Sequence, residues 1–417
     1  MKNAMAKSHV FISKYKLEFF YICGFVLLQI FLYRTWIIAT NKPTLSIKDE
    51  PTFKTIDFPR KEVKSLVYHC CTPSNNNSIR TNVYFIKTHK TGSTTVQSVI
   101  LRFAKKKSLS VMNLKYESYL WPLSNWSIFQ NTLTANGKYH VLAQHTRYNS
   151  SLKSYQYPDT SMVTILRHPV TVFSSIYHYF KMDNYMGMTF RQFLSKPVKP
   201  SRLYGIDSNF AYRGYNQMSV DLGFDIKQSE NDTAIDEFIR KIDREFDLVM
   251  ITEYMEESLV LLANLMGWPL EYVAHLNLNS VASKSDSYTL TDHDKDTIMD
   301  LNYVDSLLYY HFLKKFRKCV RQYGHEKLNY QVQQLKVSNQ QLKERCVADE
   351  TVLGLYSGSV NVKQYVPKNP FDLECIYSTI PDRGKNLSPE MISWDLFQSS
   401  YTQNLFKKIY SYDNSLR

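Results

Sequence analysis

The sequence predicts an α/β fold with a mostly parallel central sheet covered by helices. Its 417 residues are 44% apolar and 14% aromatic, which is enough for a large core. Apolar, strand-like runs recur at Val83–Ile86, Tyr139–Ala143, Met162–Leu166 and Leu248–Ile251. Helical patterns fall between them, notably at Pro169–Lys181, Asp232–Arg244 and Met255–Met266. Strands that alternate with helices are typical of parallel sheets buried on both faces.

The N-terminal region predicts a membrane anchor. Residues 19–39 are predominantly apolar, include Gln29, and carry Arg34 as their only charge. At about 1.5 Å per residue this stretch spans roughly 30 Å, the thickness of a bilayer core. Lysines cluster before it, so the positive-inside rule places residues 1–18 in the cytosol as a tail. A cleaved signal peptide is the alternative, but Ile37-Ile38-Ala39 lacks the small-residue cleavage pattern.

The remainder is predicted to be lumenal, with a stem at residues 40–78 and one domain at 79–417. Prolines punctuate the stem, and its apolar periodicity is poor. Glycosylation sequons agree with this location and begin at Asn76, Asn125, Asn149, Asn231 and Asn386. In such an oxidising compartment we predict a Cys346–Cys375 disulfide, which would close a loop of about thirty residues. The adjacent Cys70 and Cys71 are not expected to bond to each other.

A polar loop between the first strand and a helix predicts an anion site. It reads KTHKTGSTT, from Lys87 to Thr95. The N–H groups of a helix's first turn lack partners within the helix, and the helix dipole is positive there. Gly92 allows a close backbone approach, and Lys90 adds a charge. The nucleoside-triphosphatase pattern fails, because its two glycine positions hold Tyr84 and His89. The simpler alternative is a polar loop with a capping threonine.

Two further strand ends carry candidate chemistry, since ligands of open α/β sheets bind beyond the carboxyl ends of strands. His145 follows the second strand and could accept a proton near neutral pH. Arg167 follows the third strand, and Ser175 lies eight residues later, so the two could grip one phosphate. The alternatives are a structural histidine, an arginine at a sheet edge and a packed serine. His89 and His178 are the competing histidines, and His178 is expected to be packed among aromatic residues.

The charge pattern narrows the class of partner. The formal net charge of +13 suits an anionic cofactor or substrate. Nucleic acid is disfavoured, because the longest basic run is Lys105-Lys106-Lys107, a solvated helix end.

No Cys/His spacing indicates zinc. An apolar stripe from Leu328 to Cys346 predicts a helix packed on its own domain, with a homodimer contact as the alternative.

Four segments together resemble the galactose-3-O-sulfotransferase family of Golgi type II membrane enzymes. They are the cradle KTHKTGSTT, the HTRY turn, TILRHPVTVFSSIYHYF and FDLVMITEYMEESLVLLANLMGW, in the family's order. The likeness runs from about Asn82 to Gly324. It implies a P-loop-like sulfotransferase fold and a lumenal catalytic domain at the Golgi membrane. It also implies a glycan acceptor. No metal is expected, because sulfate monoesters carry less charge than phosphates.

The resemblance implies a donor, 3′-phosphoadenosine-5′-phosphosulfate, and roles for the site residues. Arg167 and Ser175 would hold its 3′-phosphate, and His145 would be the base, with Lys90 also assisting transfer. Lys284 is a weaker candidate for a basic residue that closes over the donor. The 5′-phosphosulfate would lie in the loop formed by Lys90, Thr91, Gly92, Ser93 and Thr94.

The expected reaction transfers a sulfuryl group to a carbohydrate, at the 3-hydroxyl of a terminal β-galactose on a glycolipid or glycoprotein. Alternatives are another sugar position, such as a uronic acid 2-hydroxyl, or a lumenal glycan-binding protein without activity. The sequence departs from the family at His168, where Asp is usual, and at Thr171, where Arg is frequent. The first departure is expected to alter how the following helix is capped.

Overall fold

A computed structural model describes residues 79–112, 134, 136–198, 214–278, 289–354, 361–369 and 371–379. Within those ranges no helix has both the length and the apolar character that a membrane span requires. The predicted tail, anchor and stem, as well as Cys70, Cys71 and Lys284, lie outside the described residues. The sequon residues Asn149 and Asn231 lie inside them, and both are exposed.

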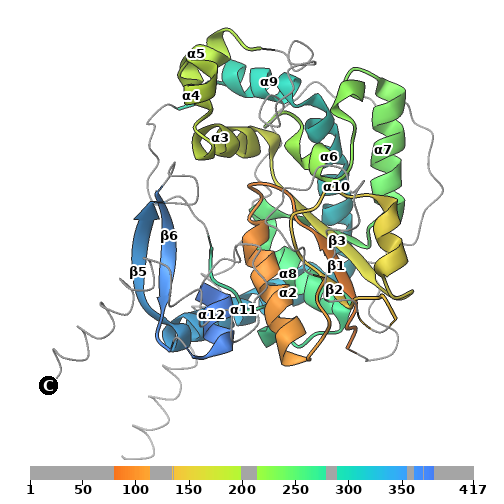
Figure 1. Cartoon of the computed structure of the whole chain (residues 1–417), viewed down its shortest axis with the longest axis vertical. Coiled ribbons are helices and arrows are strands. Elements are labelled where there is room, and N and C mark those ends of the chain that lie inside the picture. The colour runs from red at the N-terminus through yellow and green to blue at the C-terminus, as the bar shows by residue number, and fades with distance from the viewer. Residues whose placement is uncertain are drawn as a thin grey trace, which may run out of the picture. The chain divides into compact units, whose positions relative to one another are not determined.

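The central sheet has four parallel strands in the order β2-β1-β3-β4 (Figure 1). Every residue of these strands is buried, which explains their continuous apolar sequences. β1 pairs with β3 through Tyr84 and Met162, and β3 pairs with β4 through Thr164 and Val249. The predicted parallel α/β sheet is confirmed. The strand bounds are Val83–Ile86 for β1, Val141–Leu142 for β2, Ser161–Leu166 for β3 and Leu248–Ile251 for β4.

The second strand is shorter than the predicted Tyr139–Ala143. The N–H of Tyr139 donates to the carbonyl of Tyr155 at 2.9 Å, and Tyr139 bridges to Gln156. The backbone of Tyr139 therefore pairs with the segment at Gln156, and the chain pairs with β1 from Val141 onward. Ala143 stays buried beyond the end of the strand.

Helices flank the sheet (Figure 1). Both α8 and α10 pack on β4, and α2 packs on β2. In the first half of the domain the helices are α2 (Ser93–Lys106), α3 (Pro169–Tyr179), α4 (Met182–Met186), α5 (Phe190–Ser195), α6 (Gln217–Asp221) and α7 (Asp232–Glu245). In the second half they are α8 (Met255–Met266), α9 (Asp292–Leu301), α10 (Tyr303–Tyr323), α11 (His325–Cys346) and α12 (Leu373–Thr379).

Helix α3 ends two residues before the predicted Lys181. Lys181 takes a left-handed conformation with φ 48°, so the chain turns there and begins α4. A small apolar cluster joins α3 to the following helices and α9, and includes Phe173, Tyr177, Phe193 and Ile298. The aromatic run of this segment therefore packs a second, smaller core beside the main one.

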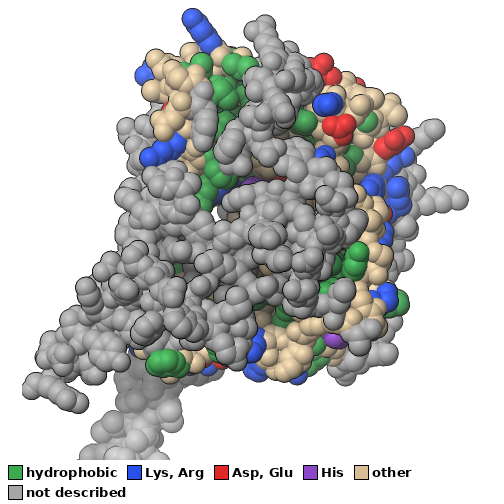
Figure 2. Space-filling view, in the orientation of Figure 1, with side chains coloured by type: hydrophobic (Ala, Val, Ile, Leu, Met, Phe, Trp, Pro, Cys, Tyr) green, Lys and Arg blue, Asp and Glu red, His purple; other side chains and the backbone are tan. Residues whose placement is uncertain are grey.

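The main core lies between the sheet and its helices. Helix α7 shows how the sequence pattern directs this packing. It buries Ile235, Phe238, Ile239 and Ile242 at helical spacing. Charged side chains occupy the region of α7 in the space-filling view (Figure 2), and Arg240 pairs with Asp236 there at 2.7 Å.

The C-terminal part confirms two predictions. Helix α11 buries Leu328 and Leu335 and packs on α8, α10 and α12 of its own chain. Cys346 and Cys375 form the predicted disulfide, with S–S 2.03 Å, which ties the end of α11 to α12. Between these helices lies an antiparallel hairpin of β5 (Val347–Gly354) and β6 (Asn361–Pro367).

Candidate functional site

The loop after β1 forms a tight turn whose backbone conformation depends on two left-handed residues. Lys90 has φ 59°, and Gly92, the N-cap of α2, has φ 73°. A Cβ added at Gly92 would lie 2.9 Å from the Cε of Met255. The φ angle therefore favours glycine there, whereas the Met255 methyl is the end of a flexible side chain and can move aside. Non-glycine residues with positive φ cost energy and persist where the surroundings hold them, as at Lys90.

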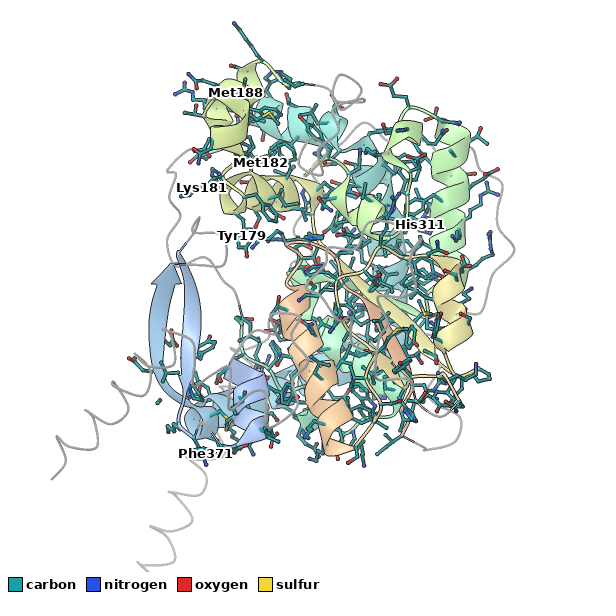
Figure 3. The ribbon with its side chains drawn as sticks, in the orientation of Figure 1. Tyr179, Lys181, Met182, Met188, His311 and Phe371 are labelled. Atoms are coloured by element: carbon teal, nitrogen blue, oxygen red, sulfur yellow. A yellow bond between two sulfur atoms is a disulfide. The ribbon has the colours of Figure 1, made fainter. Side chains whose placement is uncertain are left out.

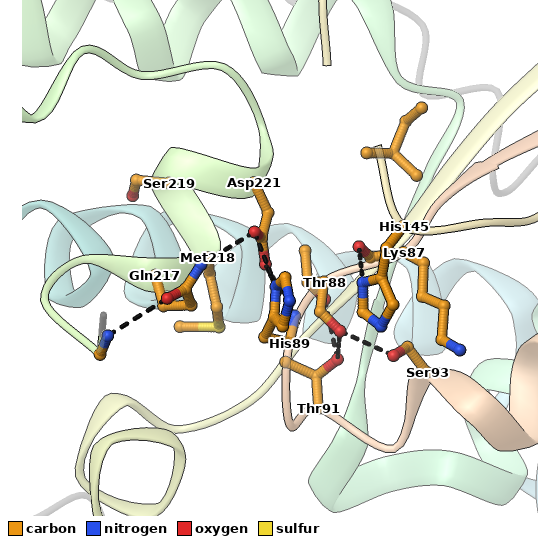
Figure 4. Close-up of polar contacts among 12 residues, drawn as sticks. Lys87, Thr88, His89, Thr91, Ser93, His145, Gln217, Met218, Ser219 and Asp221 are labelled. Atoms are coloured by element: carbon orange, nitrogen blue, oxygen red, sulfur yellow. Dashed lines mark hydrogen bonds and ion pairs between the residues drawn. The ribbon is translucent and has the colours of Figure 1, made fainter. Parts of the chain in front are cut away.

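Hydroxyl groups hold this loop in shape. The Ser93 Oγ donates to the carbonyl of Thr88 at 2.6 Å, and the Thr91 Oγ1 lies 2.8 Å from the Thr88 Oγ1 (Figure 4). Thr88 in turn donates to the Ile165 carbonyl of β3 at 2.5 Å, and Thr252 donates to the Thr91 carbonyl at 2.5 Å. Thr91 and Ser93 are buried. These two residues can therefore serve an anion through their backbone N–H groups, while their hydroxyls bind the loop to the sheet.

Lys90 is the central cation of the loop. Its Nζ lies 3.6 Å from the ring centre of Tyr179, at the end of α3. Figure 3 labels Tyr179 close to the N-terminal end of α2. Burial lowers the pKa of Lys90 to about 8, and the charges of Arg167 and Lys87 act in the same direction. An anion placed among these three cations would relieve their repulsion.

Arg167 lies beside Lys90, as the strand order predicts. Its Nη1 donates to the Lys90 carbonyl at 3.0 Å. Burial lowers its pKa, and the charge of Glu253 opposes that shift. Ser175 is half-buried two turns along α3. Lys90 and Arg167 thus meet at the carboxyl ends of β1 and β3.

The turn after Arg167 leads into α3. His168 is the N-cap of α3, and its side chain makes no capping hydrogen bond. Its backbone N–H donates to Glu253 Oε1 at 2.9 Å, and its ring lies 3.3 Å from the Tyr310 hydroxyl. The Thr171 Oγ1 donates to the His168 carbonyl at 2.8 Å. Glu253, which lies just after β4, therefore holds the turn at His168 in place.

His145 lies at the end of β2, next to the loop. Its Nδ1 is 3.1 Å from the Lys87 carbonyl. A carbonyl only accepts hydrogen bonds, so Nδ1 carries the proton and Nε2 keeps its lone pair. Burial holds the pKa of His145 well below its usual value, and the neighbouring His89 and Lys87 lower it further. The imidazole is therefore neutral at physiological pH.

A second imidazole, that of His89, lies against His145 with ring centres 4.3 Å apart (Figure 4). Its Nδ1 is 2.8 Å from the carboxylate of Asp221, which also accepts the His89 backbone N–H at 2.7 Å. Gln217 donates to the same carboxylate at 3.0 Å. This His–Asp pair orients the His89 ring.

Asp221 is a site residue that sequence reasoning missed. It lies 132 residues from His89 on the short helix α6, and no local motif marks it. The carboxylate of Asp305 on α10 holds this helix by accepting the N–H groups of Met218 at 3.1 Å and Ser219 at 2.7 Å. Burial raises the pKa of Asp305 to about 6. Asp221 is thus presented by a buried polar network, which only the tertiary structure reveals.

Lys87 begins the loop, and its side chain has a structural role that the sequence does not predict. Its Nζ donates to Gln97 Oε1 at 2.5 Å, and Gln97 donates to the Ala143 carbonyl at 2.7 Å. These two hydrogen bonds link β1, α2 and the segment after β2 that carries His145. Lys87 therefore helps to set the position of the segment that carries the imidazole.

His178 and the arginine of the HTRY turn contact other parts of the fold. His178 contacts Tyr177 and Phe190, so the expectation that it is packed is confirmed. Arg147 donates to the Phe224 carbonyl at 2.7 Å. Among the described residues, no three His, Cys, Asp or Glu side chains gather as a metal site would need.

The loop fits a phosphosulfate donor on its own chemistry. A backbone turn at a helix N-terminus, a buried lysine with a lowered pKa and a neighbouring arginine all favour a multiply charged oxyanion. A neutral imidazole beside them can accept a proton. The arrangement can therefore hold an anionic leaving group while a hydroxyl is deprotonated next to it.

Comparison with known proteins places this chain in a family. Residues 56–376 match the family model described as galactose-3-O-sulfotransferase. The chain is 33% identical to galactose-3-O-sulfotransferase 3 of Mus musculus over 300 residues, covering 69% of this chain and 68% of that protein. It is 32% identical to the Homo sapiens protein of the same name over 315 residues, with 72% of each chain covered. It is 28% identical to galactosylceramide sulfotransferase of Mus musculus over 305 residues, covering 68% and 69%. This chain therefore belongs to the galactose-3-O-sulfotransferase family and is a carbohydrate sulfotransferase.

Proposed function

We propose that the enzyme transfers a sulfuryl group from 3′-phosphoadenosine-5′-phosphosulfate to the 3-hydroxyl of a terminal β-galactose on a glycolipid or glycoprotein. The observation that carries the proposal is the meeting of Lys90, Arg167 and His145 at the carboxyl ends of three parallel strands. The names of the relatives support galactose as the acceptor sugar. A membrane anchor at residues 19–39 and a lumenal Golgi location belong to the same proposal.

The donor would be held from two sides. The backbone of Thr91, Gly92, Ser93 and Thr94 would cradle the 5′-phosphosulfate at the start of α2. Arg167, with Ser175, would bind the 3′-phosphate, since a guanidinium matches phosphate oxygens. Lys90 would neutralise charge on the bridging oxygen as the bond to sulfur breaks.

The proton would leave through His145. In the reaction, the sugar oxygen forms a bond to sulfur, and the bond from sulfur to the bridging phosphate oxygen breaks. The phosphate oxygen keeps the electron pair, and the hydroxyl proton passes to the Nε2 of His145. Its Nδ1 contact with the Lys87 carbonyl supports this tautomer. Positioning and charge stabilisation would supply most of the rate enhancement, as in phosphoryl transfer.

A pair of substitutions tests these roles. His145→Ala should lower turnover by about 10²–10⁴-fold, the usual contribution of a general base. It should bind 3′-phosphoadenosine-5′-phosphate nearly as well as the wild type. Arg167→Ala should instead weaken nucleotide binding by about 2–3 kcal/mol, through loss of a charge-assisted contact. Sulfate-transfer rates and calorimetric affinities for both variants separate the two roles.

His89 is the second candidate for the base, because Asp221 orients it and its ring stacks on His145. His89→Asn provides the matched comparison. If His145→Ala keeps full turnover and His89→Asn loses it, the base is His89. If the wild type binds nucleotide but sulfates no sugar in a broad panel, the chain is a glycan-binding protein. A panel that contains both galactosides and uronic acids identifies the acceptor position.

A further inference from the structure

A pocket of about 480 Å³ lies at the opposite end of helix α2 from the catalytic loop. Its walls come from the C-terminal half of α2, the 3₁₀ turn Leu270–Val273, α11 and α12. Arg102 lies nine residues after Ser93, which places it about 14 Å further along the helix. This pocket is therefore separate from the loop that binds the donor.

The floor of the pocket contains a buried arginine with spare hydrogen-bonding capacity. Arg102 lines the pocket and is only 7% exposed. One guanidinium nitrogen, Nη2, donates to the Ala274 carbonyl, while Nε is buried without a hydrogen-bond partner. Burial lowers the pKa of Arg102 to about 10, and Glu374 opposes this shift. Since Nε is closed to solvent, an oxyanion in the pocket would interact with the guanidinium through its positive charge and its Nη groups.

The charge of the pocket favours an anion as well. Lys105, Lys106 and Arg345 line it together with Arg102, against two acidic residues. One of those acids, Glu374, forms an ion pair with Arg345 at 3.0 Å, and its charge also acts on Arg102 without forming an ion pair with it. Arg102 thus has no carboxylate within ion-pair distance among the described residues.

The other residues that line the pocket indicate which class of molecule would bear the anionic group. Tyr272 is the partly exposed aromatic side chain of the lining, and Lys106 lies 4.3 Å from its ring centre. Ser338, Gln341 and Glu271 add groups that can bond to hydroxyls. Its volume lies within the range of small-molecule pockets and suits one or two sugar units. A sugar ring has both an apolar C–H face and hydroxyl groups, whereas a free inorganic anion would use neither the aromatic wall nor Glu271.

We propose that this pocket binds an acidic sugar, through a sulfate or carboxylate group held by Arg102. The site lies outside the reaction centre, so it would retain glycans that already carry negative charge. It goes beyond the proposed reaction and does not depend on it, because binding here requires neither donor nor turnover.

Calorimetric titration of the full-length protein in detergent tests the proposal. The probes are galactose 3-sulfate and glucuronic acid, with uncharged galactose and sodium sulfate as controls. The wild type should bind the acidic sugars more tightly than either control. Galactose can also occupy the acceptor site, and that binding should be unchanged in Arg102→Gln. Arg102→Gln should weaken binding about tenfold or more, as expected for loss of a hydrogen bond to a charged group.

Glu374→Gln provides a test with the opposite sign. It should strengthen binding severalfold, because it removes a negative charge from the wall and releases Arg345. Misfolding would not produce that result, so this variant decides the case if Arg102→Gln does not fold. Lys343→Gln is the matched control, since Lys343 lies on α11 outside the pocket and pairs with Glu350. Its affinity should equal that of the wild type.

Three outcomes would overturn the proposal. The first is a folded Arg102→Gln protein that binds acidic sugars as tightly as the wild type. The second is unchanged affinity in Glu374→Gln. The third is equal affinity for sodium sulfate and galactose 3-sulfate, which would make the pocket a site for inorganic anions.

Discussion

The two ends of helix α2 favour anions in different ways. At the N-terminal end, the helix dipole and the backbone of the turn at Gly92 attract negative charge together with Lys90 and Arg167. At the C-terminal end the dipole is unfavourable to anions, so Arg102, Lys105 and Lys106 must supply the attraction. A backbone site requires one conformation of one short segment. A side-chain site requires several distant elements to be brought together.

Loss of the disulfide should have the largest effect, and it should act on one end of α2 only. Changing Cys346 and Cys375 to serine should lower the free energy of unfolding by about 3–4 kcal/mol, in the chain-entropy model. The affinity for 3′-phosphoadenosine-5′-phosphate should stay within about twofold of wild type while the protein remains folded. Denaturant titration together with calorimetry measures both quantities. A large loss of nucleotide affinity in folded protein would show that the two ends are coupled.

Substitution of Gly92 should act on the other end. Gly92→Ala places a side chain at φ 73° and a Cβ near the end of Met255, so the backbone is strained and the Met255 side chain must move. We expect a loss of about 1–2 kcal/mol in stability from the left-handed conformation alone, and weaker nucleotide binding. Adding Met255→Ala should relieve the steric contact but leave the cost of the φ angle. Complete rescue of nucleotide binding by Met255→Ala would mean that sterics, rather than conformation, set the requirement for glycine.

The pH dependence of nucleotide binding should report the charge of Lys90. The pKa of Lys90 is lowered from 10.5 to about 8, so in the free protein its charge is lost as the pH rises through 8. Affinity should fall with increasing pH, by up to about tenfold per pH unit above that value. The effect on stability has the opposite sign: the charged lysine destabilises the fold below pH 8, and this cost fades between pH 8 and 10.5.

Calorimetry between pH 7 and 9.5 tests the dependence. Binding near pH 8 should also take up a proton, which is detected with buffers of different ionisation enthalpy. Lys90→Arg is the control, because arginine does not titrate in this range. If Lys90→Arg shows the same pH dependence as the wild type, a different group titrates.

The Arg345–Glu374 pair should have the smallest effect on stability. Both side chains are about half exposed, at 53% and 46%. A double-mutant cycle should therefore give only about 0.2–1 kcal/mol for their interaction in the free energy of unfolding. The same substitution of Glu374 should change the affinity for acidic sugars, as argued above. A stability coupling well above that range would indicate that the pair holds α12 in place.

The comparison also explains what could be predicted from the sequence. The loop from Lys87 to Thr95, the bounds of β1 and β4 and those of α8 follow from apolar runs and local turn chemistry. Lys90, Arg167 and His145 could be grouped because parallel strands bring their carboxyl ends to one edge.

Asp221 and Arg102 could not be predicted in the same way. The first reaches the site through α6 and Asp305, far away in the chain. Arg102 is followed at the end of the helix by three lysines, and from the sequence alone these lysines indicate a helix end that is exposed to solvent. Those lysines are indeed exposed, and only the packing of α11 and α12 turns their surroundings into a pocket.

The bond between Cys346 and Cys375 has a practical consequence for the choice of expression host. It ties α12 to α11, and α12 contributes Glu374 to the pocket wall and accepts the Ser98 hydroxyl of α2 at the Tyr377 carbonyl. In a host cytosol that keeps thiols reduced, this tie would not form. We therefore expect material prepared there to keep the donor loop but to present an incomplete second pocket. A screen for glycan binding should use protein secreted through an oxidising pathway.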